Sequence, residues 1–189
     1  AGGSGGCRTS VLSALRHPET ARGMLLLSAS GGPYSCQFLG YNYHVPYIMA
    51  AEAGGMEAVA QTPFFADRIA ASPSNRERLL ALDPVGFARQ LKRWNEAFYY
   101  NPQATLAGIA DVMLPRIDMP TLIVAGNDDV HPPSVSDALS RLIPTASLIA
   151  SPWSNDDWLD KFTGRGGGSV FDLYPLLAPH LLQFVREHP

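Results

Sequence analysis

The feature that most restricts the fold of this chain is the alternation of short apolar runs with helical patterns. The runs GMLLLSA (23–29) and MPTLIVAG (119–126) lead into turn-forming residues, as fully buried strands do, and SLIA (147–150) fits a third strand. Apolar residues with helical spacing lie over 7–17, before the first run, and over 132–144, between the second and the third. Strands that alternate with helices indicate a parallel α/β sheet.

The stretch between the first two runs has a different character, because it contains no convincing strand. Helical patterns occur there around 46–60, 75–82 and 84–100. Prolines separate these patterns, at Pro63, Pro73, Pro84 and Pro102. We therefore predict an all-helical insertion placed on top of the sheet.

The C-terminal part is predicted to end in a loop and a helix. Residues 151–169 form a polar loop rich in Trp and Gly, and 171–188 form a closing helix whose regular part is delayed by Pro175 and Pro179. The predicted division of the chain is a core segment (1–40), a helical cap (41–116) and a second core segment (117–189).

Composition and charge exclude two classes of partner. The 189 residues carry a formal net charge of −3 at pH 7, and no run of Lys or Arg forms a basic stripe, so we expect no nucleic-acid partner. No apolar stretch approaches the roughly 20 residues that span a bilayer, and no secretory signal opens the chain. We therefore expect no membrane partner and a cytoplasmic protein.

The two cysteines, Cys7 and Cys36, lie in no metal-ligand spacing, and we expect neither a metal nor an organic cofactor. Two thiols in a chain of this length favour a reducing compartment, although one disulfide also fits the count.

The sequence Gly2-Gly3-Ser4-Gly5-Gly6 satisfies G-x-S-x-G, the pattern of a nucleophile elbow. Gly/Ser runs are also typical of flexible linkers and expression scars, but here a helix and a buried strand follow directly. In an elbow the serine occupies a strained turn, and a Cβ at the flanking positions would collide with the adjacent strand or helix. The helix N-terminus makes the Gly5 N–H a natural oxyanion donor.

The order of elbow, helix, strand, helical insertion and PTLIVAGNDDVHPP (120–133) resembles the α/β-hydrolase superfamily over nearly the whole chain. The resemblance covers the piece from the elbow through the cap to the last helix, and the GGS start is similar to the esterase and proline iminopeptidase branches. It implies a Ser-Asp-His triad with Ser4 as the nucleophile. Its acid follows the strand after the cap in a G-x-x-D-x-x-x-P pattern, which Gly126, Asp129 and Pro133 match.

For the NDD sequence that contains Asp129, a second interpretation is open. Asn and Asp cap helix N-termini, so these residues also fit a capping role for the helix that starts near Pro132. We predict that Asp129 is the catalytic acid, with Asp128 as its neighbour.

The sequence departs from the family at the histidine, which the resemblance places after the last strand, where 151–169 has none. Without an imidazole to take the Ser4 proton, most of the general-base contribution would be lost. We predict that His131, two residues beyond Asp129, is the base or contacts substrate. A plain loop histidine, a base from a part of the protein outside this sequence, and the amine of Ala1 are the alternatives.

Substrate-binding residues are expected beside the serine, at Gly3, and in two further places. His44 opens the insertion and either faces the pocket from the cap or lies on the surface. Trp153 occupies the loop of the missing histidine and either packs that loop onto the sheet or lines the pocket. The same loop holds Trp158, Asp156 and Asp157, and an acid there is a candidate for a weaker base.

Proteins of this superfamily carry several strands before the elbow and a loop that donates a second oxyanion N–H, and the resemblance finds none of them here. Three strands alone would expose unpaired backbone groups and a large apolar face. We therefore expect a missing N-terminal half, either as a second chain made by cleavage or as a segment outside this sequence.

These features predict a serine hydrolase that acts on an ester, an amide or a similar carbonyl of a small-molecule substrate. Two alternatives share the fold: a non-catalytic ligand-binding protein with an incomplete triad, and a lyase or C–C bond hydrolase.

Overall fold

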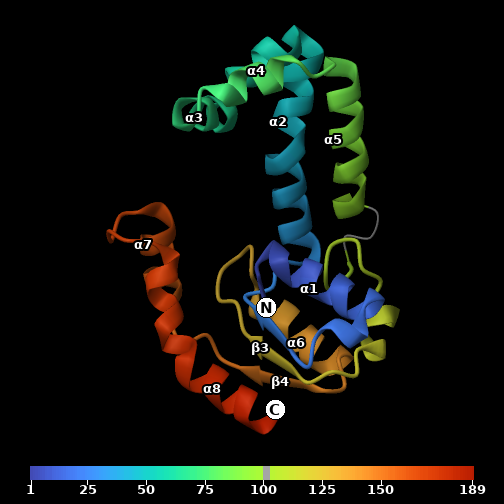
Figure 1. Cartoon of the computed structure of the whole chain (residues 1–189), viewed down its shortest axis with the longest axis vertical. Coiled ribbons are helices and arrows are strands. Elements are labelled where there is room, and N and C mark those ends of the chain that lie inside the picture. The colour runs from blue at the N-terminus through green and yellow to red at the C-terminus, as the bar shows by residue number, and fades with distance from the viewer. Residues whose placement is uncertain (100–102) are drawn as a thin grey trace. The chain divides into compact units, whose positions relative to one another are not determined.

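The structure is a computed structural model that describes residues 1–99 and 103–189, and it divides into two compact units. One unit, which we call the core unit, consists of Ala1–Ser35 and Gln103–Pro189, and the other, the helical unit, spans Cys36–Pro102 (Figure 1). Each unit is described below by itself.

The core unit is built on a four-stranded parallel sheet with the order β1-β2-β3-β4. The strands are β1 (Gly2–Gly3), β2 (Met24–Leu27), β3 (Thr121–Val124) and β4 (Ala146–Ile149). The last three confirm the runs predicted from sequence. The expectation that no strand precedes the elbow is wrong, because Gly2 and Gly3 pair with Leu26 and Leu27. A strand of two glycines has no side-chain pattern from which it could be predicted.

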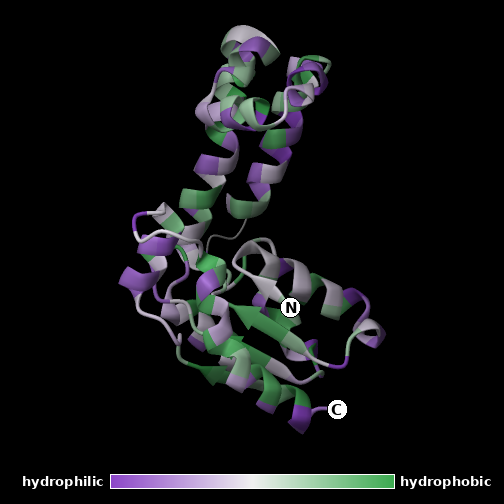
Figure 2. Ribbon diagram, turned by 60° about the vertical axis from the view of Figure 1, so that its left-hand side comes forward, coloured by the Kyte–Doolittle hydropathy of each residue, from purple (hydrophilic) through white to green (hydrophobic). Residues whose placement is uncertain are grey.

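Both faces of the sheet are covered. Helices α1 (Gly5–Arg16) and α6 (Pro133–Leu142) pack on the face that carries Met24, Leu26 and Ile123. Successive residues of a strand point to opposite faces, so Leu25, Leu27 and Val124 face the other way. There they pack with the 3-10 helix η3 (Val170–Leu177) and with Leu181 of α8 (Ala178–Glu187). Figure 2 shows the strands in the green of hydrophobic residues, which explains why they appear in the sequence as uninterrupted apolar runs.

The segment predicted as a loop over 151–169 contains a helix, α7 (Asn155–Thr163). A capping box starts it: the Ser154 hydroxyl accepts a hydrogen bond from the Asp157 N–H, and the Asp157 carboxylate accepts one from the Ser154 N–H. The remaining short helices of the core unit are 3-10 turns, η1 (Pro18–Thr20) and η2 (Asp111–Arg116).

Every element that the structure describes in the helical unit is a helix. These are α2 (Gly32–Ala60), which starts in the core unit and is interrupted at Gly54 and Gly55, then α3 (Pro63–Ala71), α4 (Ser74–Leu80) and α5 (Pro84–Tyr99). Their apolar faces form one cluster around Ile48, Val59 and Leu91. Tyr100 and Pro102, which the sequence analysis used as boundaries, lie outside the described residues.

The helical unit is shorter than the insertion of 41–116 predicted from sequence. Residues after 103 belong to the core unit, because Leu106, Ile109, Leu114 and Ile117 are buried in the cluster formed by α1, β2 and α6. Among the described residues 1–99 and 103–189, no helix is long and apolar enough to cross a membrane.

The parallel strands direct four loops to one edge of the sheet. Ser4, Ser28 and Asn127 follow the carboxyl ends of β1, β2 and β3, and Trp153 lies four residues after β4. In open α/β sheets, ligands bind outside the carboxyl ends of the strands. This edge is where the candidate site lies.

Candidate active site

Ser4 occupies a strained turn between β1 and α1. Its backbone φ is +51°, in the left-handed region that residues other than glycine rarely adopt. The turn is held by hydrogen bonds from Ser4 N to the Leu27 carbonyl (3.0 Å) and from Cys7 N to the Ser4 carbonyl (3.0 Å). Strain of this kind collects at functional sites, where the surrounding structure maintains it.

The glycines of the elbow are needed to different degrees. A Cβ at Gly2 would lie 2.2 Å from the Gly6 carbonyl oxygen, so this position requires glycine. The collision expected at every flanking position is not general, because a Cβ at Gly5 or Gly6 meets nothing within 4 Å among the described residues. Close approach of β1 to α1 explains the difference.

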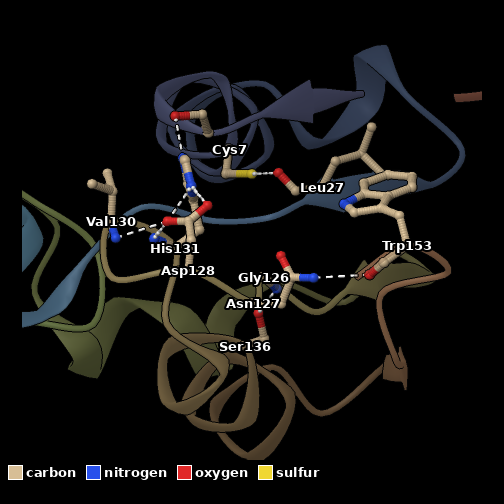
Figure 3. A network of polar contacts seen from close by, with 10 residues as sticks. Cys7, Leu27, Gly126, Asn127, Asp128, Val130, His131, Ser136 and Trp153 are labelled. Carbon is tan, nitrogen blue, oxygen red and sulfur yellow. Dashed lines mark hydrogen bonds and ion pairs between the residues drawn. The ribbon is translucent and has the colours of Figure 1, made fainter. Parts of the chain in front are cut away.

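Cys7 fixes the elbow from below. Its thiol lies 3.2 Å from the Gly2 carbonyl oxygen and 3.3 Å from the Leu27 carbonyl oxygen, and it donates to this backbone (Figure 3). Burial raises the pKa of the Cys7 thiol to about 12, so it stays protonated at neutral pH. Cys7 and Cys36 are both free and buried in this structure.

His131 lies against the serine. Its Nε2 is 2.8 Å from Ser4 Oγ, and its Nδ1 is 2.8 Å from Asp128 Oδ2 and 3.0 Å from Asp128 Oδ1. Nδ1–H can donate to the carboxylate only in the tautomer that leaves a lone pair on Nε2, which then accepts the hydroxyl proton of Ser4. The three side chains therefore form a chain of hydrogen bonds from carboxylate to imidazole to hydroxyl.

The carboxylate in this chain is that of Asp128, whereas the sequence analysis expected Asp129. Asp128 Oδ1 also accepts hydrogen bonds from the backbone N–H groups of Val130 and His131, both at 2.8 Å (Figure 3). These bonds turn the Asp128 side chain toward its own loop, where the ring three residues later meets it. The capping alternative considered for NDD has a counterpart here, since Asp128 does bind backbone N–H groups, although within the loop and not at α6.

The environment of Asp128 favours its charged form. Burial raises the pKa of the carboxyl, but the hydrogen bond and charge of His131 and the two backbone N–H groups outweigh it, so the pKa lies below its usual value. The side chains of Asp128 and His131 are only 13% and 10% exposed, so the pair is shielded from water.

Gly126 makes room for the loop that carries this pair. A Cβ at Gly126 would lie 2.1 Å from the His131 carbonyl oxygen and 2.6 Å from the His131 Cβ. The Gly126 N–H donates to the buried Ser136 hydroxyl at 3.3 Å (Figure 3). The loop is thus closed at both ends, and no other residue fits at 126.

A cavity of about 200 Å³ opens beside Ser4 and His131. Two of the predicted substrate-binding residues, Gly3 and Trp153, lie in its wall. The other lining residues are Leu27, Ser28, Trp158 and Tyr174. Asp156 and Asp157 are exposed and do not line it, so the structure gives no support to an acid as the base in that loop.

The aromatic residues of this wall form one stack. The rings of Trp153 and Trp158 are 6.1 Å apart and nearly parallel, and Tyr174 lies against Trp153 at 6.2 Å. Trp158 contacts the edge of the catalytic candidate His131 at 6.0 Å. The tryptophans therefore both pack the loop and line the cavity, which the sequence analysis gave as alternatives.

His44 belongs to the helical unit, and the structure accounts for it there. Its Nδ1 lies 3.1 Å from the Gly40 carbonyl oxygen and 3.1 Å from Asn95 Oδ1, and its ring packs against Phe98. The contacts described for this side chain are those of a buried residue that joins α2 to α5.

Sequence reasoning missed three residues of the site. Ser28, Trp158 and Tyr174 carried no motif, because their positions follow from packing between segments far apart in the chain. For Ser28, a left-handed φ of +47° marks the position, but this is visible only in the structure. In the parts of the chain that the structure describes, no group of three or more His, Cys, Asp or Glu side chains is arranged to hold a metal ion.

Comparison with known proteins finds similarity at the level of structure alone. No protein-family model matches the sequence, and no curated protein matches it. Among solved structures, Rv0554 of Mycobacterium tuberculosis aligns with 100% of the chain (16% identity, TM-score 0.53), and the putative non-heme bromoperoxidase BpoC of the same organism with 98% (15% identity, TM-score 0.53). The enol-lactonase of Burkholderia xenovorans LB400 aligns with 97% (18% identity, TM-score 0.47).

The chain spans 63% of the length of the enol-lactonase and 65% of the length of each of the two mycobacterial proteins. The aligned part includes the parallel sheet, the elbow and the inserted helices. The chain thus has the α/β-hydrolase fold, represented by the part that runs from the nucleophile elbow to the last helix.

Proposed function

We propose that this protein is a serine hydrolase in which Ser4 is the nucleophile, His131 the general base and Asp128 the residue that orients the base. The observation that carries the proposal is the 2.8 Å contact between His131 Nε2 and Ser4 Oγ, made by a ring whose other nitrogen binds Asp128. A nucleophile within hydrogen-bond reach of a base that a third group orients is the general signature of an activated hydroxyl.

In the first half-reaction, Ser4 Oγ attacks the carbonyl carbon of an ester, an amide or a similar substrate while His131 Nε2 takes the hydroxyl proton. The developing oxyanion accepts a hydrogen bond from the Gly5 N–H at the start of α1, where the helix dipole also favours negative charge. Collapse of the tetrahedral intermediate breaks the bond to the leaving group, which receives the proton from His131.

In the second half-reaction, a water molecule attacks the acyl-enzyme with His131 as base, and Ser4 regains its proton when the acid leaves. Asp128 stays ionised throughout, which its lowered pKa supports. Its carboxylate holds the ring and stabilises the imidazolium that forms in each half-reaction.

The cavity supports a small acyl or alcohol group next to the reacting carbonyl. Its volume of about 200 Å³ is below the range of roughly 300–1,000 Å³ that drug-sized ligands occupy. Leu27 and the rings of Trp153 and Trp158 give it apolar walls, and Gly3 leaves space beside the serine. The helical unit follows β2 directly in the chain, and we propose that it acts as a cap over the substrate, with His44 in a structural role.

We further propose that the active protein includes a segment that adds strands beside β1. The length of the solved structures that the chain matches supports this, as does β1 itself, whose two residues pair on one side with β2 while no strand described here pairs on the other. Such a segment would supply the second oxyanion donor. Intact mass spectrometry under native conditions is expected to find a species heavier than 20.4 kDa, or a second bound polypeptide, in the active protein.

Hydrolysis of short-chain 4-nitrophenyl esters tests the proposed activity. The wild-type protein is expected to release nitrophenol with a burst that labels Ser4, while Ser4→Ala abolishes turnover and His131→Ala lowers it by about a hundredfold or more. A wild-type protein that binds these esters without turnover would indicate a ligand-binding protein of the same fold. Turnover that survives Ser4→Ala would contradict the assignment of the nucleophile.

A further inference from the structure

We propose that the indole N–H of Trp153 donates a hydrogen bond to an acceptor oxygen of the substrate and so selects substrates that carry such an oxygen near the reacting carbonyl. The inference rests on the proposed function, because it assigns part of the substrate of the same site.

The indole nitrogen of Trp153 has no hydrogen-bond partner among the residues that the structure describes. Trp153 is only 5% exposed, and its Nε1 is out of contact with solvent. An indole nitrogen can only donate, so no rearrangement of protons satisfies it. Buried donors without a partner are rare in native proteins because leaving one unpaired is unfavourable. A donor of this kind points to an acceptor that binds from outside the chain.

The ring of Trp153 is fixed in place, so it cannot turn to find another partner. Its carbonyl oxygen accepts hydrogen bonds from Asn127 Nδ2 (2.8 Å) and from the Ser151 hydroxyl (2.9 Å). Trp158 and Tyr174 stack on the indole at 6.1 Å and 6.2 Å. A donor held rigidly in this way is preorganised for a ligand, and little rotamer freedom is lost on binding.

The nitrogen lies in the wall of the catalytic cavity. Trp153 lines the same cavity as Ser4 and His131, and Figure 3 shows its indole nitrogen on the side of the ring that faces Leu27, another residue of that wall. The surroundings of the nitrogen are the apolar Leu27 side chain and aromatic rings, which offer it no acceptor. An ether, hydroxyl or carbonyl oxygen on a substrate in this cavity would complete the site.

The test compares 4-nitrophenyl pentanoate with two esters of equal chain length, the ethoxyacetate and the 3-methoxypropanoate, in which an oxygen replaces one methylene. The measured quantity is the ratio of kcat/KM for each ether ester to kcat/KM for pentanoate, in the wild-type protein and in Trp153→Phe. Intrinsic reactivity cancels when the ratios of two variants are compared. We expect the ratio of at least one ether ester to fall by about three- to tenfold in Trp153→Phe.

Trp158→Phe is the matched control, because it removes an indole N–H from the same wall, and its ratios are expected to stay within about twofold of the wild-type ratios. Ratios in Trp153→Phe that also stay within about twofold would overturn the proposal and would mean that water satisfies the indole. Proposed function and further inference fail separately: if no ester is turned over, the activity is wrong, whereas turnover with unchanged ratios removes only the role of Trp153.

A second measurement leaves Trp153 intact and covers a Trp153→Phe variant that does not fold. In Ser4→Ala protein labelled with ¹⁵N at tryptophan, the three indole N–H signals are assigned by comparison with Trp94→Phe and Trp158→Phe. We expect the Trp153 proton to shift downfield when ethoxyacetate or 3-methoxypropanoate ester binds and to stay in place with pentanoate. Equal shifts with all three esters would overturn the proposal.

Discussion

At the scale of single residues, the site differs from the family pattern in where its histidine lies. Acid and base are three residues apart on one loop after β3, and together they reach Ser4 on another strand. The loop supplies its own orientation, because backbone N–H groups of Val130 and His131 bind the Asp128 carboxylate. A histidine after the last strand is therefore not needed to complete the chain of hydrogen bonds, and its place is filled by the aromatic stack of Trp153 and Trp158.

Adjacent carboxylates give a sharp test of this arrangement. Asp128→Asn is expected to lower kcat/KM by about 10²- to 10⁴-fold, because the amide cannot hold the tautomer or stabilise the imidazolium. Asp129→Asn removes the same charge one residue away and is expected to leave kcat/KM within about threefold, since Asp129 makes no hydrogen bond to His131. A larger loss in Asp129→Asn than in Asp128→Asn would restore the acid predicted from sequence.

The lowered pKa of Asp128 also predicts a pH dependence of stability. A carboxyl whose folded-state pKa lies below its unfolded value of about 3.9 stabilises the fold fully above that value and loses the contribution as the pH falls through the folded-state pKa. The free energy of unfolding in urea, measured from about pH 5 to pH 2, should thus fall more steeply for the wild-type protein than for Asp128→Asn. Parallel curves for the two proteins would contradict the assignment of the ion pair.

At the scale of elements, the loop after β3 acts as one unit, and Gly126 is its hinge with the core. Gly126→Ala places a Cβ 2.1 Å from the His131 carbonyl oxygen, so the loop must move and carry the imidazole away from Ser4. We expect kcat/KM to fall by about a hundredfold or more, with a fold retained by near-UV circular dichroism. Full activity in a folded Gly126→Ala protein would show that the close contact is absent in solution.

The same scale explains what the sequence could and could not predict. The strands β2, β3 and β4 and the helices α1 and α6 were predictable because their burial imposes apolar runs and helical periods. Helix α7 was missed because Gly and Trp around 151–169 suggested a loop, although Ser154 and Asp157 have the spacing of a capping box. Ser4 and His131 were predicted, but the preference for Asp129 over Asp128 depended on which carboxylate turns toward the ring, which no pattern encodes.

At the scale of the whole molecule, a parallel sheet brings loops from four strands to one edge, so residues separated by 127 positions meet at hydrogen-bond distance. The sequence predicted this layout and the helical insertion, while the boundary at 102 and 103 depended on apolar residues after 103 that pack against α1. Patterns within a segment show which of its faces is buried, but not which neighbour covers it.

The measurement that tests the central claim most directly is covalent labelling by a fluorophosphonate, followed by peptide mapping, in the wild-type protein and in His131→Ala and Asp128→Asn. An activated serine reacts with this reagent, whereas an ordinary surface serine does not. The account predicts one adduct, on the peptide that contains Ser4, with a labelling rate that falls by about a hundredfold or more in His131→Ala and by a smaller factor in Asp128→Asn. An adduct on another residue, no adduct, or a rate unaffected by His131→Ala would contradict it.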